Sequence, residues 1–413
     1  MSASASLRQR LAEIYEVGNL ESRNLPMEGV RGFAVLLVFF VHYHSMFDPW
    51  AQAEPFSRAF STFTGTIGHS GVDLFFVLSG YLIYGLIFRK PGRYMKFIER
   101  RIQRIYPTFL MVLAVYLLLS ILFPGQSKIP ADRMAAAIYI LENILLLPGL
   151  LNIQPIITVA WSLSYEFFYY LSIPSLIALL GMRRWSSYQR VVLFLVLALG
   201  YTVYCLYAPN THIRLIMFVS GILLFEAKYS YGLDKKLKPR ADYWVLALLC
   251  VTFALFYVLT ARPELLSFLP QDQKFVAVYP TLVLFVSFFV FALACFDSQS
   301  LLSRIFSWTP LRWLGNMSYS YYLIHGLTLK GIARVVLPLV APSRASVVAY
   351  WIALPVFFLL TVFVSTILFV LVEKRFSIQP VNAPSTKSSK LSSVEVPVPA
   401  LSAEMTENAL DPN

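Results

Sequence analysis

The sequence predicts an all-α integral membrane protein, a bundle of about ten transmembrane helices with both termini in the cytoplasm. Of its 413 residues, 58% are hydrophobic and 14% are charged, and the mean hydropathy is +0.65. A soluble protein of ordinary composition carries about 25% charged residues. The apolar residues also arrive in blocks of roughly 18 to 25, the length that crosses a hydrocarbon core of about 30 Å. Composition and block length together therefore set the fold class.

Ten apolar blocks are predicted to span the membrane: 30–47, 68–88, 104–123, 160–180, 191–207, 213–228, 242–260, 276–296, 313–329 and 346–371. An eleventh segment, 134–149, contains Glu142 and Asn143, so we expect a short re-entrant or interfacial helix there. With ten spans and a cytoplasmic N-terminus, 25 of the 34 Lys and Arg residues fall on the inner side. Counting 134–149 as a span would move the later basic loops outside and break the positive-inside rule.

The chain is predicted to have three parts. Residues 1–25 form a polar cytoplasmic lead, 26–376 form the transmembrane domain, and 377–413, rich in Ser, Pro and Ala, form a disordered cytoplasmic tail. The net charge of +12 resides in short loops between apolar blocks, where it meets lipid and not nucleic acid. The three cysteines are widely spaced in apolar stretches and predict neither a metal site nor a disulfide. Any chemistry is therefore expected inside the bundle.

Ionisable residues within the first two spans are the first candidate functional groups, because burying charge in a membrane is costly. Arg31 and His42 are eleven residues apart, which places them on one helix face about 16 Å apart along the axis. His69 and Asp73 share a face of the second span, where the carboxylate could orient an imidazole. The alternatives are a snorkelling arginine, a structural histidine and an aspartate favoured by the helix dipole.

A basic cluster precedes the third span. Arg100, Arg101 and Arg104 lie within five residues and form a compact site for phosphate groups, although basic flanks are also what membrane topology demands. Further along the chain, Glu166 is expected about two turns into the membrane from the outer side. With Arg214 and with Tyr319 and His325 of the ninth span, these groups predict a polar path from the cytoplasm towards the outer face.

At this point the sequence resembles a known family. The segment from Met27 to His42, which contains Arg31, is similar to the signature of the membrane acyltransferase-3 family of bacterial O-acetylases. These enzymes modify lipopolysaccharide, peptidoglycan, exopolysaccharide and related glycoconjugates. Four further stretches resemble its motifs in the same order: Gly71–Tyr81, Arg101–Pro107, Trp161–Tyr169 and Leu314–His325. The resemblance covers about residues 25 to 375. Glu28 stands where the family more often has Asp, and we expect no counterpart of the esterase-like domain that some members add.

The resemblance implies an O-acyltransferase of the bacterial inner membrane that takes an acetyl or similar acyl group from cytoplasmic acetyl-CoA. It implies that Arg31 and His42 are essential and that Glu166 belongs to the functional core. The acceptor is expected to be a hydroxyl of a sugar or glycoconjugate at the outer side. We predict His42 as general base, because imidazole titrates near neutral pH, and Asp73 or Glu166 as the group that orients it. The predicted donor-binding residues are Arg100, Arg101 and Arg104, and the predicted substrate-binding residues are His69, Arg214, Tyr319 and His325.

A transporter or flippase of a lipid-linked sugar is the competing prediction. Ten spans, buried charges and an aromatic-rich interior are typical of that class too. Such a protein would move its substrate without consuming acyl-CoA. No metal is expected in either case.

Overall fold

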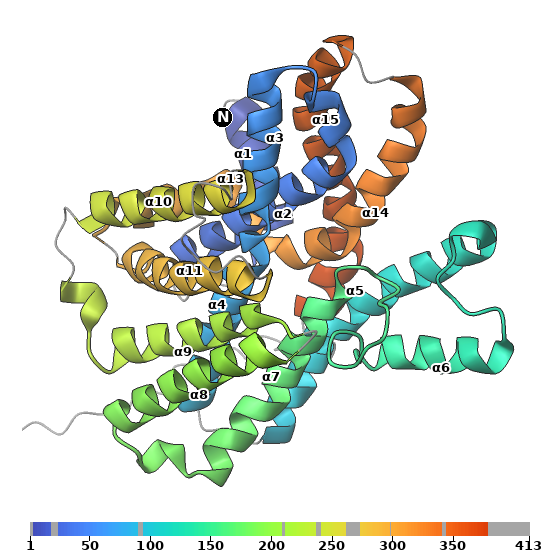
Figure 1. The fold of residues 1–413 in the computed structure, drawn as a ribbon. Coiled ribbons are helices and arrows are strands. Elements are labelled where there is room, and N and C mark those ends of the chain that lie inside the picture. Colours follow the sequence, from blue (N-terminus) through green and yellow to red (C-terminus); the bar gives the residue numbers. More distant parts are fainter. Residues whose placement is uncertain are drawn as a thin grey trace, which may run out of the picture. The chain divides into compact units, whose positions relative to one another are not determined.

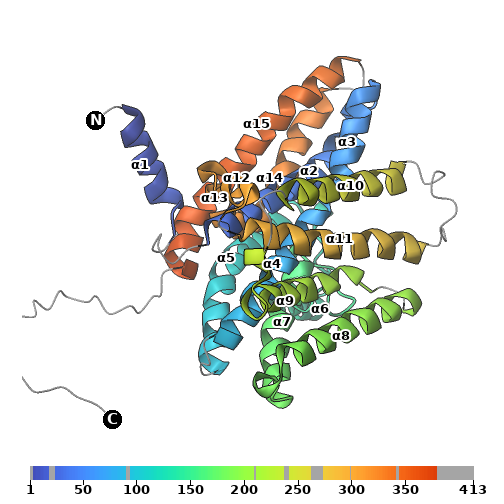
Figure 2. The same ribbon diagram turned by 90° about the vertical axis from the view of Figure 1, so that its left-hand side faces the viewer.

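The computed structural model describes residues 3–17, 24–89, 94–208, 211–236, 241–261, 273–297, 299–340 and 344–378. The predicted tail at 379–413 lies outside these residues. In the described part the chain is helical, and its elements are connected by short turns (Figures 1 and 2). The helices are α1 Ala3–Tyr15, α2 Leu25–Ala51, α3 Pro55–Gly68, α4 Ser70–Arg89, α5 Tyr94–Leu122, α6 Arg133–Ile144, α7 Ala160–Leu179, α8 Ser187–Tyr207, α9 Ile216–Tyr229, α10 Ala241–Ala261, α11 Gln273–Cys295, α12 Leu301–Phe306, α13 Thr309–Asn316, α14 Ser318–Val336 and α15 Arg344–Leu368.

Shorter turns complete the chain between and after these helices. The tight 3-10 turns are η2 Pro124–Gln126, η3 Met182–Arg184, η4 Ile213–Leu215, η5 Leu233–Lys236 and η7 Leu337–Leu339. After α15 the helix widens into a π-helix, η8 Phe369–Ile378. π-Helical turns are rare and often lie at functional sites.

Eight helical stretches in the described part are long and apolar enough to cross a membrane. They are Leu25–Ala51, Pro55–Arg89, Tyr94–Leu122, Ser187–Tyr207, Ala241–Leu259, Val278–Cys295, Ser318–Leu339 and Ser346–Ile378. The other two predicted spans correspond to α7, which is rich in Tyr and Ser, and to α9, which has only 14 residues. The predicted count of ten spans, and the cytoplasmic position of the termini, therefore stay predictions.

Segment 134–149 does not form a crossing helix. It contains α6, whose 12 residues reach about 18 Å at 1.5 Å per residue, and the helix projects from the side of the bundle in Figure 1. The following chain folds back into the core, where Leu146, Ile156 and Ile157 are buried.

Two helical stretches begin earlier than the spans predicted within them. The stretch that contains the second predicted span begins at Pro55, since α3 and α4 run on with only His69 between them. Hydroxyl side chains of α3 form hydrogen bonds with the backbone of the same helix. The Thr64 hydroxyl, for example, donates to the Phe60 carbonyl at 2.8 Å. Likewise α5 begins at Tyr94, so the arginine cluster lies on a helix and not in a loop.

Two tight crossings fix the centre of the bundle. On α2 and α13, a Cβ at Gly32 would lie 2.0 Å from the Leu311 carbonyl oxygen, and one at Gly315 would lie 1.7 Å from the Glu28 carbonyl oxygen. Helices α4 and α9 approach through Gly80 and Gly221 in the same way. Small residues of this kind let membrane helices pack backbone to backbone. Helices α8, α9, α11 and α10 then lie side by side in that order (Figures 1 and 2).

We expect Gly221→Ala to lower the stability of the bundle by about 1–3 kcal/mol, the usual cost of overpacking. The new methyl group would lie 2.0 Å from the Val77 carbonyl oxygen of α4. Gly200→Ala on α8 is the matched control, because nothing lies within 4 Å of a Cβ there. Thermal unfolding of both purified variants in one detergent measures the difference. A Gly221→Ala protein that melts with the wild type would contradict the tight crossing.

Candidate functional site

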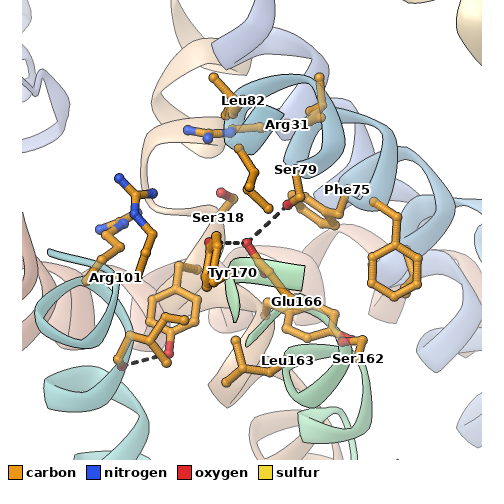
Figure 3. A pocket seen from close by; sticks show the side chains of 18 residues that line it. Arg31, Phe75, Ser79, Leu82, Arg101, Ser162, Leu163, Glu166, Tyr170 and Ser318 are labelled. Carbon is orange, nitrogen blue, oxygen red and sulfur yellow. Dashed lines mark hydrogen bonds between the residues drawn. The ribbon is translucent and has the colours of Figure 1, made fainter. Parts of the chain in front are cut away.

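A cavity of about 140 Å³ lies between α2, α4, α5, α7 and α14 (Figure 3). We refer to it as the arginine cavity, because three arginines line it. The remaining wall is mostly apolar and aromatic. Its lining side chains are Arg31, Val72, Phe75, Phe76, Leu78, Ser79, Leu82, Ile83, Arg101, Arg104, Ile105, Ser162, Leu163, Glu166, Tyr170, Ser318, Tyr319 and Tyr322.

The arginines come from two helices. Arg101 and Arg104 are three residues apart on α5 and so share the face that meets the cavity, whereas Arg100 is exposed and does not line it. Arg31 reaches the cavity from α2 (Figure 3). The expectation that Arg100 joins the other two is therefore not supported by its position.

Aromatic rings hold these guanidinium groups. The Arg101 Cζ lies 5.4 Å from the ring centroid of Phe97 and 5.5 Å from that of Tyr170. The Arg104 Cζ lies 5.7 Å from the ring of Tyr319. Cation–π contacts of this kind orient a cation without using its N–H donors. In the described part of the chain, the buried Nε of Arg101 has no hydrogen-bond partner. The cavity can therefore offer donors to an anionic group.

Glu166 lies in the middle of the cavity. Its Oε1 accepts hydrogen bonds from the Ser79 hydroxyl at 3.1 Å and the Tyr170 hydroxyl at 2.5 Å (Figure 3). The sequence placed Glu166 with the histidines in the outer half, but the structure places it with the arginines. The buried segment before α7 accounts for this difference, since α7 begins inside the bundle and carries Glu166 to the level of Arg31.

Tyr319 and Tyr322 both line the arginine cavity, and Tyr322 also contacts His325. The Tyr319 hydroxyl donates to the Ile105 carbonyl at 2.8 Å. The Tyr322 hydroxyl lies 2.6 Å from the Ser162 hydroxyl, and its ring centroid is 6.1 Å from that of His325. Sequence reasoning did not single out Tyr322, although it lies within the motif that contains Tyr319.

His42 and His325 form a pair. The Nε2 of His325 lies 3.3 Å from the Nδ1 of His42, and the ring centroids are 4.7 Å apart. His325 is fully buried, and its ring stacks on Tyr321 at 5.2 Å. The sequence assigned the two histidines separate roles, and the structure brings them into contact across α2 and α14.

The hydrogen bonds of this pair fix its tautomers. The Nδ1 of His42 lies 2.8 Å from the Val38 carbonyl oxygen, and the Nδ1 of His325 lies 2.9 Å from that of Tyr321. A carbonyl only accepts, so each neutral ring carries its proton on Nδ1. The His42 Nδ1–H then also points to the unprotonated Nε2 of His325. The Nε2 of His42 keeps a free lone pair, which is the form a general base requires.

A third group joins Asp73, His69 and Arg214. The Arg214 Nε lies 3.8 Å from the Asp73 Oδ1, and its Nη1 donates to the His69 carbonyl at 3.1 Å. Asp73 is buried, and its Oδ1 has no hydrogen bond among the described residues. The contact partner of Asp73 is thus Arg214, whereas the sequence had paired this carboxylate with an imidazole.

His212, which sequence reasoning missed, extends this third group. Its ring stacks on Trp161 with centroids 5.2 Å apart and an angle of 22°. Partial burial, and secondly the charge of Arg214, lower the pKa of His212 below its ordinary value. The ring therefore favours its neutral form and packs as an aromatic face. In the described part of the chain, no group of three or more His, Cys, Asp or Glu side chains could hold a metal ion.

Comparison with known proteins places the chain among acyltransferases. A family model described as an acyltransferase domain matches residues 25–370. The peptidoglycan O-acetyltransferase OatA of Listeria monocytogenes is 27% identical over 326 residues, covering 72% of this chain and 48% of that protein. The O-acetyltransferase OatA of Staphylococcus aureus (strain NCTC 8325) is 27% identical over 340 residues, with 77% and 52% covered.

A third relative is the putative peptidoglycan O-acetyltransferase YrhL of Bacillus subtilis, 27% identical over 337 residues, with 73% of this chain and 48% of the relative covered. The chain thus spans about half the length of the curated relatives it matches. No solved structure matches it significantly. The match and the apolar helices together establish a multi-pass membrane protein.

The tautomers of the histidine pair can be measured. At pH 8, above the ordinary imidazole pKa of about 6.5, ¹⁵N-histidine spectra are expected to show both His42 and His325 protonated on Nδ1 alone. The reason is that each Nδ1 faces a backbone carbonyl. Loss of single resonances in His42→Gln and His325→Gln proteins assigns the signals. An Nε2–H tautomer in either ring would overturn the arrangement.

Proposed function

The chain belongs to the membrane acyltransferase-3 family, and on that premise we propose that it is an O-acyltransferase moving an acetyl-type group from acyl-CoA to a glycan hydroxyl. The observation that carries the proposal is the arginine cavity, which joins cations to the histidine pair through Tyr322. A phosphate-bearing thioester needs a cationic site for its charged end and a base near its acyl end.

The residues of the arginine cavity fit such a donor. Arg101 and Arg104 would hold its phosphates by charge-assisted hydrogen bonds, which are roughly twice as strong as neutral ones. Arg31 would contact the donor between these phosphates and His42. The cavity volume of about 140 Å³ is below the roughly 300–1000 Å³ of clefts that enclose a whole ligand. A cavity of this size suits the narrow pantetheine arm of acyl-CoA, which carries the thioester.

In the proposed reaction the Nε2 of His42 takes the proton of the acceptor hydroxyl. The hydroxyl oxygen attacks the thioester carbonyl, the carbon–sulfur bond breaks, and the proton passes to the departing thiolate to give ester and free thiol. Acyl transfer of this kind needs mainly a base and stabilisation of the developing charge. His325 would accept the Nδ1–H of His42 and hold the ring in its productive tautomer. A covalent acyl-imidazole relay through His42 is the variant of this mechanism.

We assign different roles to the carboxylates of Glu166 and Asp73. Glu166 lines the arginine cavity and would balance the charge of Arg31 and Arg101. Asp73, with its buried Oδ1, would bind the acceptor together with Arg214 and His69. Tyr319 would line the donor path beside Arg104. We propose that the Val38 carbonyl and His325 orient His42, in place of Asp73 or Glu166, because both lie at its Nδ1.

We also propose ten spans with both termini in the cytoplasm, the donor entering from the inner side and the acceptor bound at the outer side. The distribution of Lys and Arg supports this topology. Two of the three relatives are named as peptidoglycan O-acetyltransferases, one of them as putative, so a bacterial cell-envelope glycan is the acceptor class we propose.

Removal of His42 should abolish transfer. We expect His42→Ala to lower the rate at least about 100-fold, the contribution of a general base, with folding unchanged. The measurement is incubation of the purified protein with radiolabelled acetyl-CoA and a glycan extract from the host. His44→Ala is the control, since His44 lies two residues on and bonds to Ser61 at 2.9 Å.

Label in the glycan with wild type and His44→Ala, but not with His42→Ala, is the expected result. Equal labelling by His42→Ala would remove it as the base. If the wild type neither binds nor consumes acetyl-CoA or another acyl-CoA, the transporter of lipid-linked sugar becomes the leading function.

Arg101→Gln should weaken donor binding. Loss of one charge-assisted hydrogen bond of about 1.5–3 kcal/mol predicts a KM for acetyl-CoA raised about tenfold or more. Acetyl-pantetheine, which lacks the nucleotide phosphates, should be used equally well by Arg101→Gln and the wild type. Arg100→Gln is the matched control, because Arg100 is exposed beside the cluster. An unchanged KM for acetyl-CoA would count against the phosphate-binding role.

A further inference from the structure

Arg104 is held from outside the arginine cavity by a carboxylate that sequence reasoning did not select. The Oε1 of Glu373 lies 2.7 Å from the Arg104 Nη1, and the Glu373 side chain is fully buried. Glu373 does not line the cavity. Its ion pair with Arg104 is a direct contact with a residue that does line the cavity, so Glu373 can influence a ligand there through Arg104.

The contact of Oε1 with Arg104 is an ion pair without hydrogen-bond geometry, whereas the other oxygen of Glu373 accepts two hydrogen bonds. Its Oε2 accepts from the Ser320 backbone N–H at 2.9 Å and from the Ser320 hydroxyl at 2.5 Å. Ser320 lies in the first turn of α14, where the helix dipole favours a negative charge. The carboxylate is thus anchored to α14, the same helix that contributes Tyr319 and Tyr322 to the cavity.

The π-helix η8 brings Glu373 to this position. It packs along α5, and the hydroxyls of Ser377 and Thr108 lie 3.1 Å apart in the buried contact. This contact sets η8 against the same helix that carries Arg104. The π-helix and its packing against α5 therefore place Glu373 beside Arg104.

The Arg104 guanidinium has neighbours on more than one side. Glu373 takes one side at Nη1, the Tyr319 ring lies 5.7 Å from the Cζ, and the group still borders the cavity. A long flexible side chain loses rotamer freedom when it binds a ligand, and holding it in place beforehand removes that cost. The anchored carboxylate therefore prepares Arg104 for an anion.

We propose that Glu373 is a positioning residue for donor binding, which holds the Arg104 guanidinium at the wall of the arginine cavity so that it binds a phosphate of acyl-CoA. The inference rests on the proposed function for its ligand. It assigns a part in donor recognition to the C-terminal π-helix.

A double-mutant cycle tests the proposal, with Glu373→Gln, Arg104→Gln and the double variant in the full chain. The measurement is the Kd of radiolabelled acetyl-CoA and of acetyl-pantetheine, by equilibrium dialysis of detergent-purified protein. We expect Glu373→Gln to raise the Kd for acetyl-CoA about tenfold and to leave that for acetyl-pantetheine unchanged. In the Arg104→Gln background, Glu373→Gln should add nothing, because Glu373 acts only through Arg104.

Glu226→Gln is the matched control. Glu226 is also fully buried, pairs with Arg190 at 2.6 Å and accepts from the hydroxyls of Tyr84, Ser187 and Ser230, but it does not line the arginine cavity. This variant should lower the melting temperature and leave the Kd for acetyl-CoA unchanged. A general loss of folding would weaken binding in both variants.

The outcomes separate the two proposals. A wild type that does not bind acetyl-CoA contradicts the proposed function itself. Wild-type binding with an unchanged Kd in Glu373→Gln, or with additive losses in the double variant, overturns the role of Glu373 alone. If Glu373→Gln does not fold, the double variant, which removes both charges, is compared with Arg104→Gln. Equal Kd values there support the proposal and a further loss contradicts it.

Discussion

The bundle depends on one constraint, that a charge taken out of water must meet an opposite charge or a set of hydrogen bonds. Arg190 and Glu226 satisfy it between α8 and α9, and Arg312 and Glu28 do so between α13 and α2. Such pairs connect different helices of the bundle, and removing one partner would leave a buried charge unpaired. In the arginine cavity the matching is incomplete, since the buried Nε of Arg101, like the Oδ1 of Asp73 outside it, has no hydrogen bond in the described part of the chain.

That imbalance gives the arginine cavity its chemistry. Three guanidinium groups line it together with one carboxylate, that of Glu166, and aromatic rings cover the faces of Arg101 and Arg104. Rings hold a cation in place but do not neutralise it. The surplus positive charge favours an anionic ligand, and a ligand that supplies it should also stabilise the folded bundle by binding the native state alone. In the proposed function that ligand is the acyl donor, and its binding would then stabilise the bundle as well.

The sequence predicted the features that arise locally, and missed those that depend on distant partners. The sequence grouped Arg100, Arg101 and Arg104, and the structure places Arg101 and Arg104 in the wall of the arginine cavity while Arg100 is exposed. Apolar block length predicted eight helical stretches that are long and apolar enough to cross a membrane, but the second of them begins earlier than its apolar block. Glu373 lies two residues beyond the last predicted span and resembles an ordinary helix end. Its role depends on Arg104, 269 positions earlier, and no local pattern encodes that pairing.

The separation between the cations and the histidines constrains the donor in the proposed reaction. Arg31 and His42 are eleven residues apart on α2, about 16 Å along the helix axis. A compact acyl phosphate could meet the arginines or the base, but not both at once. A donor with a long thin arm can hold its phosphates at Arg101 while its acyl group extends past Tyr322, whose ring lies 6.1 Å from that of His325. The narrow cavity therefore favours a thioester on an extended arm, because only such a molecule uses the binding energy of one end to position the other.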